Sequence, residues 1–197
     1  MSQSTAEKRR YTLKDRARSQ EDTRRRIVEA AVALHEELGP RATSIAAIAE
    51  RAGVQRLTVY RHLPDEEALF RACTSHWRAA HPLPRGWEGE ADPAARRARA
   101  LAAFYAYYSA NRRMLAVVAH EAPAVPALAG PLREQAAEFA AVVADLACGL
   151  GPRAAATIGV VLAYPAWEAL ERQGLADADK ASLALAWLDG AVAADRL

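Results

Sequence analysis

Gly53 separates two short stretches that each have helical spacing, and this arrangement restricts the fold more than any other feature of the chain. The first stretch, 43–52, begins at Thr43, a favourable N-cap residue. Its inner face is apolar and consists of Ile45, Ile48, Ala49 and Ala52. The second stretch covers 55–62. Glycine adopts the left-handed backbone of a sharp turn without a Cβ clash, so the pattern predicts a helix-turn-helix.

A supporting helix precedes this motif and is expected to begin near Ser19. Its apolar stripe recurs every 3.6 residues and consists of Ile27, Ala30, Ala31, Leu34 and Leu38. Gly39, followed by a proline, ends the helix. The three helices form a predicted domain over 19–64. Asp65 is expected to cap a fourth helix that reaches about Ala80.

The remainder of the chain is rich in alanine, which favours helix because alanine loses no side-chain entropy there. Further helices are expected over 94–109, 112–121, 132–148, 153–173 and 177–194, with a Pro- and Gly-rich loop over 81–92. No stretch alternates in the manner of a strand. We therefore predict an all-α chain in which a C-terminal helical domain, 65–197, follows the three-helix domain.

The second helix of the motif has a polar outer face formed by Gln55, Arg56, Thr58, Arg61 and His62. Such side chains suit base edges and phosphates, so this helix is a candidate for reading DNA. The alternative is an ordinary helical hairpin whose outer face is merely solvated.

Charge is concentrated at the N-terminus. Residues 1–26 carry nine Lys or Arg and four Asp or Glu, whereas the whole chain has a net charge of only +2. A basic arm on a slightly acidic body suggests a polyanionic partner. Residues 1–18 lack apolar periodicity and are expected to form a flexible arm, for which a solvated tail is the alternative.

Several protein classes are disfavoured by composition. Cys73 and Cys148 stand far apart, and no Cys or His cluster has metal-ligand spacing, so neither a metal nor a cofactor is expected. The N-terminus lacks the apolar core of a signal peptide. The longest nearly uncharged apolar stretch, 154–167, is too short to span a bilayer. A cytoplasmic protein without a membrane partner is therefore expected.

Residues 24–70 resemble the DNA-binding domain of TetR-family transcriptional regulators. The resemblance rests on the segments RIVEAA at 26–31, TSI at 43–45, RAGV at 51–54 and TVYRHLP at 58–64, followed by EAL at 67–69. It implies an all-helical fold, a homodimer, and a divergent C-terminal domain that binds a small molecule.

The resemblance also implies roles for single residues. Thr43 and Ser44 stand where the start of the first motif helix meets phosphate. The positions that meet bases are Gln55, Arg56, Leu57 and Thr58, and those typical of phosphate contacts are Tyr60 and His62. Arg61 belongs to the same polar face. The family often has a lysine where this chain has Glu66, between two further acids; the basic arm is expected to compensate by wrapping the duplex.

The resemblance implies a ligand pocket among the C-terminal helices. Residues that combine a polar tip with an apolar face are the candidates for its lining, namely Tyr105, Tyr108, His120 and Trp167. For each of them, core packing is the alternative.

Two apolar stripes near the C-terminus are candidates for a dimer interface, because the family dimerises through a four-helix bundle of two such helices from each subunit. One stripe is Ile158, Leu162 and Ala166, and the other is Leu183, Ala184, Trp187, Leu188 and Val192. Burial within the monomer is the alternative.

The function expected from these features is a repressor that binds an inverted-repeat operator as a homodimer and is released by a small molecule. Ligand binding is expected to move the helix that follows Asp65. A constitutive DNA-binding protein without a ligand is one alternative.

An enzyme is another alternative, because Gly149, Gly151 and Ala154 match the spacing G-x-G-x-x-A of a dinucleotide-binding loop. This segment, however, follows a predicted helix, whereas a dinucleotide-binding loop follows a strand. No enzymatic activity is therefore expected.

Overall fold

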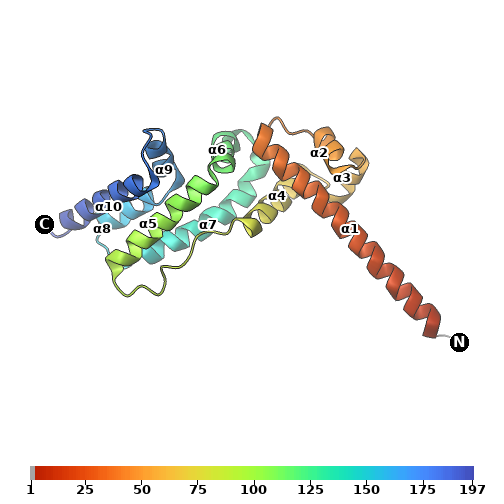
Figure 1. Ribbon diagram of the computed structural model, residues 1–197, viewed down its shortest axis with the longest axis horizontal. Helices are drawn as coiled ribbons and strands as arrows, with labels where there is room; N and C mark the ends of the chain where they lie inside the picture. Colours follow the sequence, from red (N-terminus) through yellow and green to blue (C-terminus); the bar gives the residue numbers. More distant parts are fainter. Residues whose placement is uncertain (1–2) are drawn as a thin grey trace. The chain divides into compact units, whose positions relative to one another are not determined.

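The computed structural model describes the backbone of residues 3–197 and the side chains of residues 15–197 (Figure 1). Regular structure in this range is helical and includes no strand, which confirms the predicted all-α fold. The elements in chain order are α1 (Gln3–Leu38), α2 (Ile45–Ala52), α3 (Arg56–His62), α4 (Glu66–Ala80), α5 (Pro93–Ala110), α6 (Arg112–Glu121), the 3-10 turns η1 (Ala122–Ala124) and η2 (Pro126–Leu128), α7 (Ala129–Leu146), α8 (Pro152–Val161), α9 (Tyr164–Glu171) and α10 (Asp177–Ala194).

The chain forms two compact units. The first contains residues 1–80 and 116–131, and the second contains 81–115 and 132–197. These units differ from the domains predicted on either side of residue 64, because α4 packs on α1 and on η2. Two helices, α6 and α7, have one end in each unit.

The first unit has its core between α1, α2, α3 and α4. Ile27, Ala31, Ile48 and Val59 are almost completely inaccessible to solvent there. Leu38 was expected in the same stripe, but it is 52 % exposed. The reason is that α1 ends at Leu38 and Gly39, with φ of 87°, turns the chain away.

The N-terminal boundary of α1 lies far upstream of the predicted Ser19, at Gln3. Residues 3–38 contain neither proline nor glycine, so nothing in the backbone interrupts the helix even where its sequence lacks an apolar stripe. The predicted basic arm, 1–18, lies partly outside the described residues, since side chains are described only from Asp15 onward.

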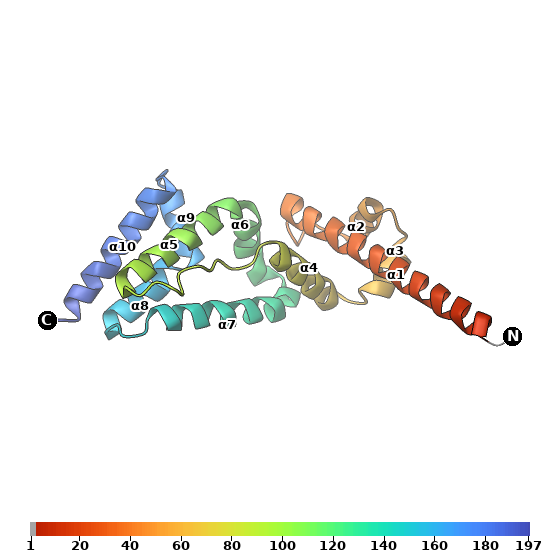
Figure 2. The same cartoon turned by 60° about the horizontal axis from the view of Figure 1, so that its bottom comes forward.

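The second unit is built around α5, against which α10 and α9 pack, and α10 also packs on α8 (Figure 2). Asp92 caps α5 by accepting hydrogen bonds from the backbone N–H groups of Ala94 (3.2 Å) and Ala95 (3.0 Å). Phe104 lies at the centre of an aromatic core and is inaccessible to solvent. Trp87 joins this core from the 81–92 loop, which sequence patterns predicted only as a connection.

The single helix predicted over 153–173 is instead two helices, α8 and α9. Pro165 explains the break, because proline has no N–H and its ring collides with the carbonyl four residues earlier. The carbonyls left without helical partners are satisfied from α5. The hydroxyl of Tyr105 donates to the Val161 carbonyl (2.9 Å), and that of Tyr108 donates to the Leu162 carbonyl (2.8 Å).

No single helix among the described residues is long and apolar enough to cross a membrane, while one bent pair, Arg112–Ala124 with Pro126–Leu146, meets the length and composition test.

Candidate nucleic-acid interface and ligand cavity

The turn between α2 and α3 has the geometry that its glycine predicts. Gly53 has φ of 64° and ψ of 42°, in the left-handed region. Its N–H donates to the Glu50 carbonyl (3.1 Å), and the next N–H, that of Val54, donates to Ala49 (2.9 Å). These bonds satisfy the last carbonyls of α2, so the chain leaves α2 at a fixed angle and α3 starts in a defined direction.

α3 is attached to the unit through Val59, which is completely buried. The opposite side of the helix is open to solvent, with Gln55, Arg56, Leu57, Tyr60 and Arg61 exposed and Thr58 half-buried. Leu57 is 78 % exposed and Tyr60 is 50 % exposed. The outer face predicted from the sequence is therefore accessible to a partner.

His62 does not share this outer face. It follows Val59 by three residues and so lies on the same side of the helix. Its Nε2 is buried and has no hydrogen-bond partner among the described residues. Burial lowers the pKa of His62, and the nearby charges of Arg61 and Arg24 lower it further. The side chain lines a hollow of 570 Å³ between α1 and α4, instead of the surface predicted for phosphate.

The two predicted phosphate contacts before α2 have different positions. Ser44, and not the predicted Thr43, is the N-cap of α2: its Oγ accepts from the N–H of Ala47 (3.2 Å), and its side chain is exposed. Thr43 is half-buried, and its hydroxyl donates to the Gly39 carbonyl (2.8 Å). The open side of the Ser44 hydroxyl is thus the better placed of the two for a further contact.

Two of the three acids at the start of α4 have structural partners. Asp65 caps the helix as predicted, because its Oδ1 accepts from the N–H of Ala68 (2.7 Å). Glu67 forms an ion pair with Arg71 one turn later. The ion pair offsets the negative charge of Glu67, so Glu66 remains the clearest difference from the lysine that the family often has at this position.

Glu121 ties the end of α6 to the entrance of the helix-turn-helix. Its Oε2 accepts from the backbone N–H of Arg41 (2.9 Å), and its carboxylate lies against Gly39 so closely that a Cβ there would collide with it. The buried His35 lies within reach of the same charge. No local pattern points to Glu121, because its partners lie some eighty positions earlier in the chain.

A cavity of 300 Å³ that is open to solvent on one side lies in the second unit. Its walls come from α5, α6, α7 and the start of α9, and include Tyr108, Leu115, Gln135, Phe139 and Tyr164. None of its lining residues carries a charge. The cavity is therefore a candidate site for an apolar ligand.

Of the four residues proposed for the ligand pocket, only Tyr108 lines this cavity. Tyr105 and Trp167 are almost fully buried in the core. Burial raises the pKa of Tyr105 to about 12, and the Trp167 ring lies 5.1 Å from the Lys180 ammonium. His120 is exposed and belongs to the first unit. Amphipathic character alone does not distinguish a core residue from a wall residue, since both are buried side chains with polar tips.

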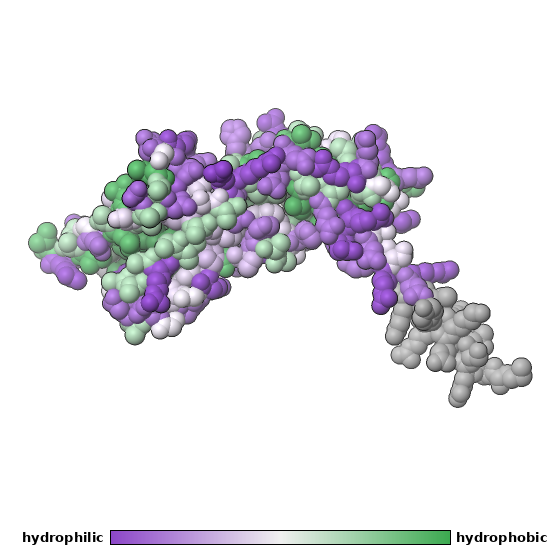
Figure 3. All heavy atoms as spheres, viewed as in Figure 1, coloured by the Kyte–Doolittle hydropathy of each residue, from purple (hydrophilic) through white to green (hydrophobic). Residues whose placement is uncertain are grey.

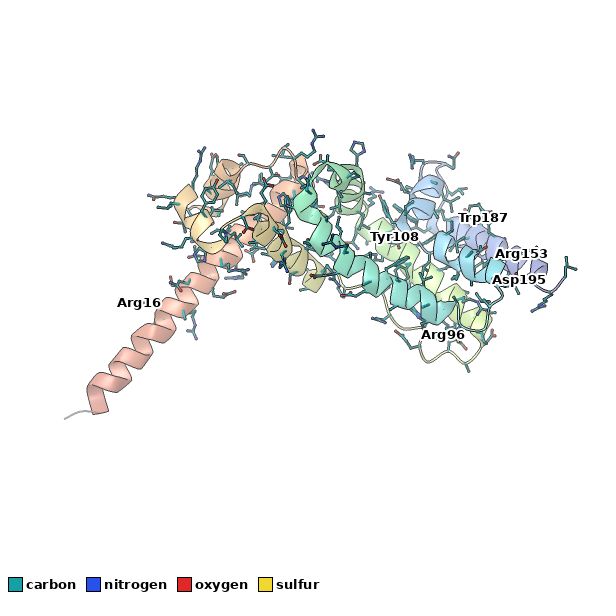
Figure 4. All side chains as sticks on the ribbon, turned by 180° about the vertical axis from the view of Figure 1, so that it is seen from behind. Arg16, Arg96, Tyr108, Arg153, Trp187 and Asp195 are labelled. Atoms are coloured by element: carbon teal, nitrogen blue, oxygen red, sulfur yellow. The ribbon has the colours of Figure 1, made fainter. Side chains whose placement is uncertain are left out.

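The two apolar stripes predicted near the C-terminus for a dimer interface are partly buried in the core and partly exposed. Ile158 and Leu162 are completely buried within the unit, contrary to their predicted place in a dimer interface. Leu183 and Trp187 are exposed by 36 % and 45 %, and Val160 on α8 is exposed by 64 %. Apolar side chains gather on the surface over α8 and α10 (Figure 3), and Trp187 projects from α10 (Figure 4).

The G-x-G-x-x-A segment has a structural role. Arg153 and Ala154 at the start of α8 donate their backbone N–H groups to the Asp195 carboxylate, at 3.1 and 2.9 Å (Figure 4). A Cβ at Gly151 would lie 2.6 Å from Asp195 Cγ. The carboxylate thus occupies the helix N-terminus at which a pyrophosphate would bind, and the glycine makes room for that contact.

Comparison with known proteins gives a consistent result. Residues 27–73 match the family profile described as bacterial regulatory proteins, tetR family. A TetR-like transcriptional regulator from Rhodococcus sp. RHA1 is similar in structure, with a TM-score of 0.60 and 19 % identity over 84 % of this chain and 93 % of its own. No curated protein sequence matches.

Two further similar structures contain small molecules. The multidrug binding protein EbrR, solved with imidazole, has a TM-score of 0.57 and 19 % identity over 86 % of this chain and 89 % of its own. RolR, solved with resorcinol, has a TM-score of 0.50 and 23 % identity over 88 % and 89 %. At these identities the likeness establishes the fold.

Proposed function

We propose that this chain, whose residues 27–73 match the profile of the tetR family of bacterial regulatory proteins, is a repressor that binds an inverted-repeat operator as a homodimer and leaves it when a small molecule binds. The observation that carries the proposal is the open outer face of α3 on a rigid support, because a recognition helix must project from its fold to enter the major groove.

The chemistry of this face suits direct reading of bases. Arg56 can donate two hydrogen bonds to guanine, and Gln55 can pair with adenine. Leu57, an exposed leucine with no packing role in its own unit, can touch a thymine methyl group. Arg56 forms no ion pair with any residue whose side chain the structure describes, so its guanidinium is available for DNA.

Dimerisation is the part of the proposal supported by the surface over α8 and α10. Val160, Leu183 and Trp187 form an apolar area there that the described chain leaves uncovered. A two-fold dimer through this area would supply two copies of α3, as an operator with two equivalent half-sites requires.

The release step is supported by the two helices shared between the compact units. Leu115 of α6 and Leu132 of α7 line the cavity. At its other end α6 finishes at Glu121, whose carboxylate binds the backbone of the loop before α2. The start of α7 directly follows η2, and η2 packs on α4. A ligand that shifts α6 or α7 would therefore act on the helix-turn-helix through Glu121 and α4, and operator affinity would fall by the difference in ligand affinity between the two states.

Selection of bound sequences from random duplex DNA is the direct test. We expect the enriched sequences to contain an inverted repeat whose half-sites are about one helical turn apart. The measurement is sequencing of DNA retained by the purified full-length chain. A single half-site without a repeat contradicts the dimer, and the absence of any enrichment contradicts the proposal itself.

Arg56→Ala is expected to relax base preference at one position of each half-site. One bidentate contact to guanine is worth about 1–3 kcal/mol of discrimination, or roughly 5- to 150-fold. Binding to the selected site and to single-base variants, measured at one salt concentration, gives this ratio. Arg133→Ala, which removes an exposed arginine of α7, is the control with the same charge change, and it should leave base preference unaltered. Equal loss for all sequences would assign Arg56 to phosphate.

A further inference from the structure

The cavity of the second unit also restricts the chemistry of its ligand. Its volume of 300 Å³ is at the lower end of the range for small-molecule pockets. The site is therefore sized for a compact molecule, and the groups on its walls determine which kind.

The uncharged lining of the cavity disfavours a charged ligand. None of the lining residues is acidic or basic, and an ion moved against these walls loses part of its hydration without gaining a counter-ion. One acid contacts a wall residue: Glu168 accepts from the Tyr164 hydroxyl (3.4 Å). Glu168 is already neutralised by Arg172, at 3.1 Å.

Aromatic rings form the walls. Tyr108 and Tyr164 meet edge to face, with ring centroids 5.5 Å apart and an interplanar angle of 82°. Phe139 faces the cavity from α7 and packs at 79° on the core residue Phe104. Flat walls of this kind favour a planar aromatic ligand, because stacked and edge-to-face pairs add to the gain from burial.

Hydrogen-bonding capacity in the cavity is small. The Tyr108 hydroxyl already donates to the Leu162 carbonyl (2.8 Å), and the Tyr107 hydroxyl donates to the His81 carbonyl (3.4 Å). Gln135 has no hydrogen-bond partner among the described residues, and its amide can both donate and accept. The Gln135 amide can therefore bond a polar group of the ligand without breaking a hydrogen bond within the described chain.

We infer that the cavity binds a neutral, compact aromatic molecule that carries a single hydroxyl or carbonyl group, held by ring contacts with Tyr108, Phe139 and Tyr164 and by one hydrogen bond to Gln135. This inference rests on the proposed function only in treating the ligand as the effector. The binding site itself does not depend on DNA recognition.

Calorimetric titration of the full-length chain at pH 7 with three probes of one ring system tests the inference. 1-Naphthol is neutral and has one hydroxyl, 1-naphthoate carries a negative charge, and naphthalene has no polar group. We expect 1-naphthol to bind and 1-naphthoate to bind at least about tenfold more weakly, because its charge is buried without a partner. Equal or tighter binding of 1-naphthoate, or no binding of 1-naphthol, overturns the inference.

Three variants test where the ligand binds. Ala136→Trp fills the cavity mouth and should abolish binding, whereas Ala137→Trp, the same change at the neighbouring exposed alanine that does not line the cavity, should not. Gln135→Leu should weaken 1-naphthol about two- to tenfold through loss of one hydrogen bond and leave naphthalene unchanged. Unaltered binding in Ala136→Trp, or equal losses for both probes in Gln135→Leu, contradicts the assigned site.

Operator binding by the same proteins separates the two proposals. Retention of a selected DNA site by the chain, together with failure to bind 1-naphthol, overturns this inference and leaves the DNA-binding proposal standing. Probe binding with the predicted pattern by a chain that selects no DNA supports the ligand class and overturns the regulator.

Discussion

Phe104→Ala is expected to cause a large loss of stability. Phe104 is completely buried, with ring centroids 5.7 Å from Trp87, 5.8 Å from Tyr108 and 5.8 Å from Phe139. Removing its ring deletes buried apolar surface and leaves a cavity among neighbours fixed by their own packing. The free energy of unfolding should fall by about 3–5 kcal/mol, which corresponds to roughly 6–20 °C in melting temperature.

Chemical denaturation at one fixed protein concentration measures this loss. Leu57→Ala is the matched control, because it also shortens an apolar side chain, but one that is 78 % exposed; its effect on stability should stay within about 0.5 kcal/mol. Phe104→Leu keeps most of the volume and should lose less than Phe104→Ala. A loss below that of the exposed control would show that the aromatic cluster is not the centre of the core.

Acidification is expected to destabilise the protein through His35. Burial lowers the pKa of His35 from 6.5 to about 4, an effect that the nearby Glu121 charge partly offsets. Between these values the unfolded chain binds a proton at His35 and the folded chain does not, so falling pH favours unfolding. Nothing is lost above pH 6.5, and the loss should reach about 3 kcal/mol near pH 4.

Denaturation curves collected from pH 7.5 to 4 test this effect. His35→Phe retains a ring stacked on Phe70, whose centroid lies 5.1 Å away, and removes the titrating group. The variant should lose clearly less stability than the parent protein over the same interval. Glu121→Gln should increase the loss, because it removes the charge that favours the protonated ring. Parallel pH profiles for the parent protein and His35→Phe would assign the acid sensitivity to other groups.

These two effects arise from residues about which sequence patterns say little. Phe104 has the helical spacing of a core residue, but nothing local indicates that Trp87, from a loop rich in proline and glycine, packs against it. His35 precedes the end of α1, and its burial depends on Phe70 and on the segment that carries Glu121. Both therefore depend on contacts between segments that are distant in the chain.

The helix-turn-helix, by contrast, could be predicted almost completely. The Gly53 turn, the capping of α4 by Asp65 and the exposed face of α3 all follow from interactions within about four residues. The errors there are one-position shifts, such as the N-cap at Ser44 instead of Thr43, and the inward turn of His62, whose side is set by Val59.

Sequence patterns were sufficient to predict an all-helical chain, the Gly53 turn, the capping of α4 by Asp65 and the outward polar face of α3, because each depends on backbone geometry and side-chain period within one or two helical turns. Contacts between distant segments, in contrast, set which tyrosines satisfy the carbonyls that Pro165 frees, which aromatic rings border a cavity, and which side chain holds the loop before α2, namely that of Glu121. These outcomes depend on which segments pack together, and burial of a side chain is a property of its neighbours in space.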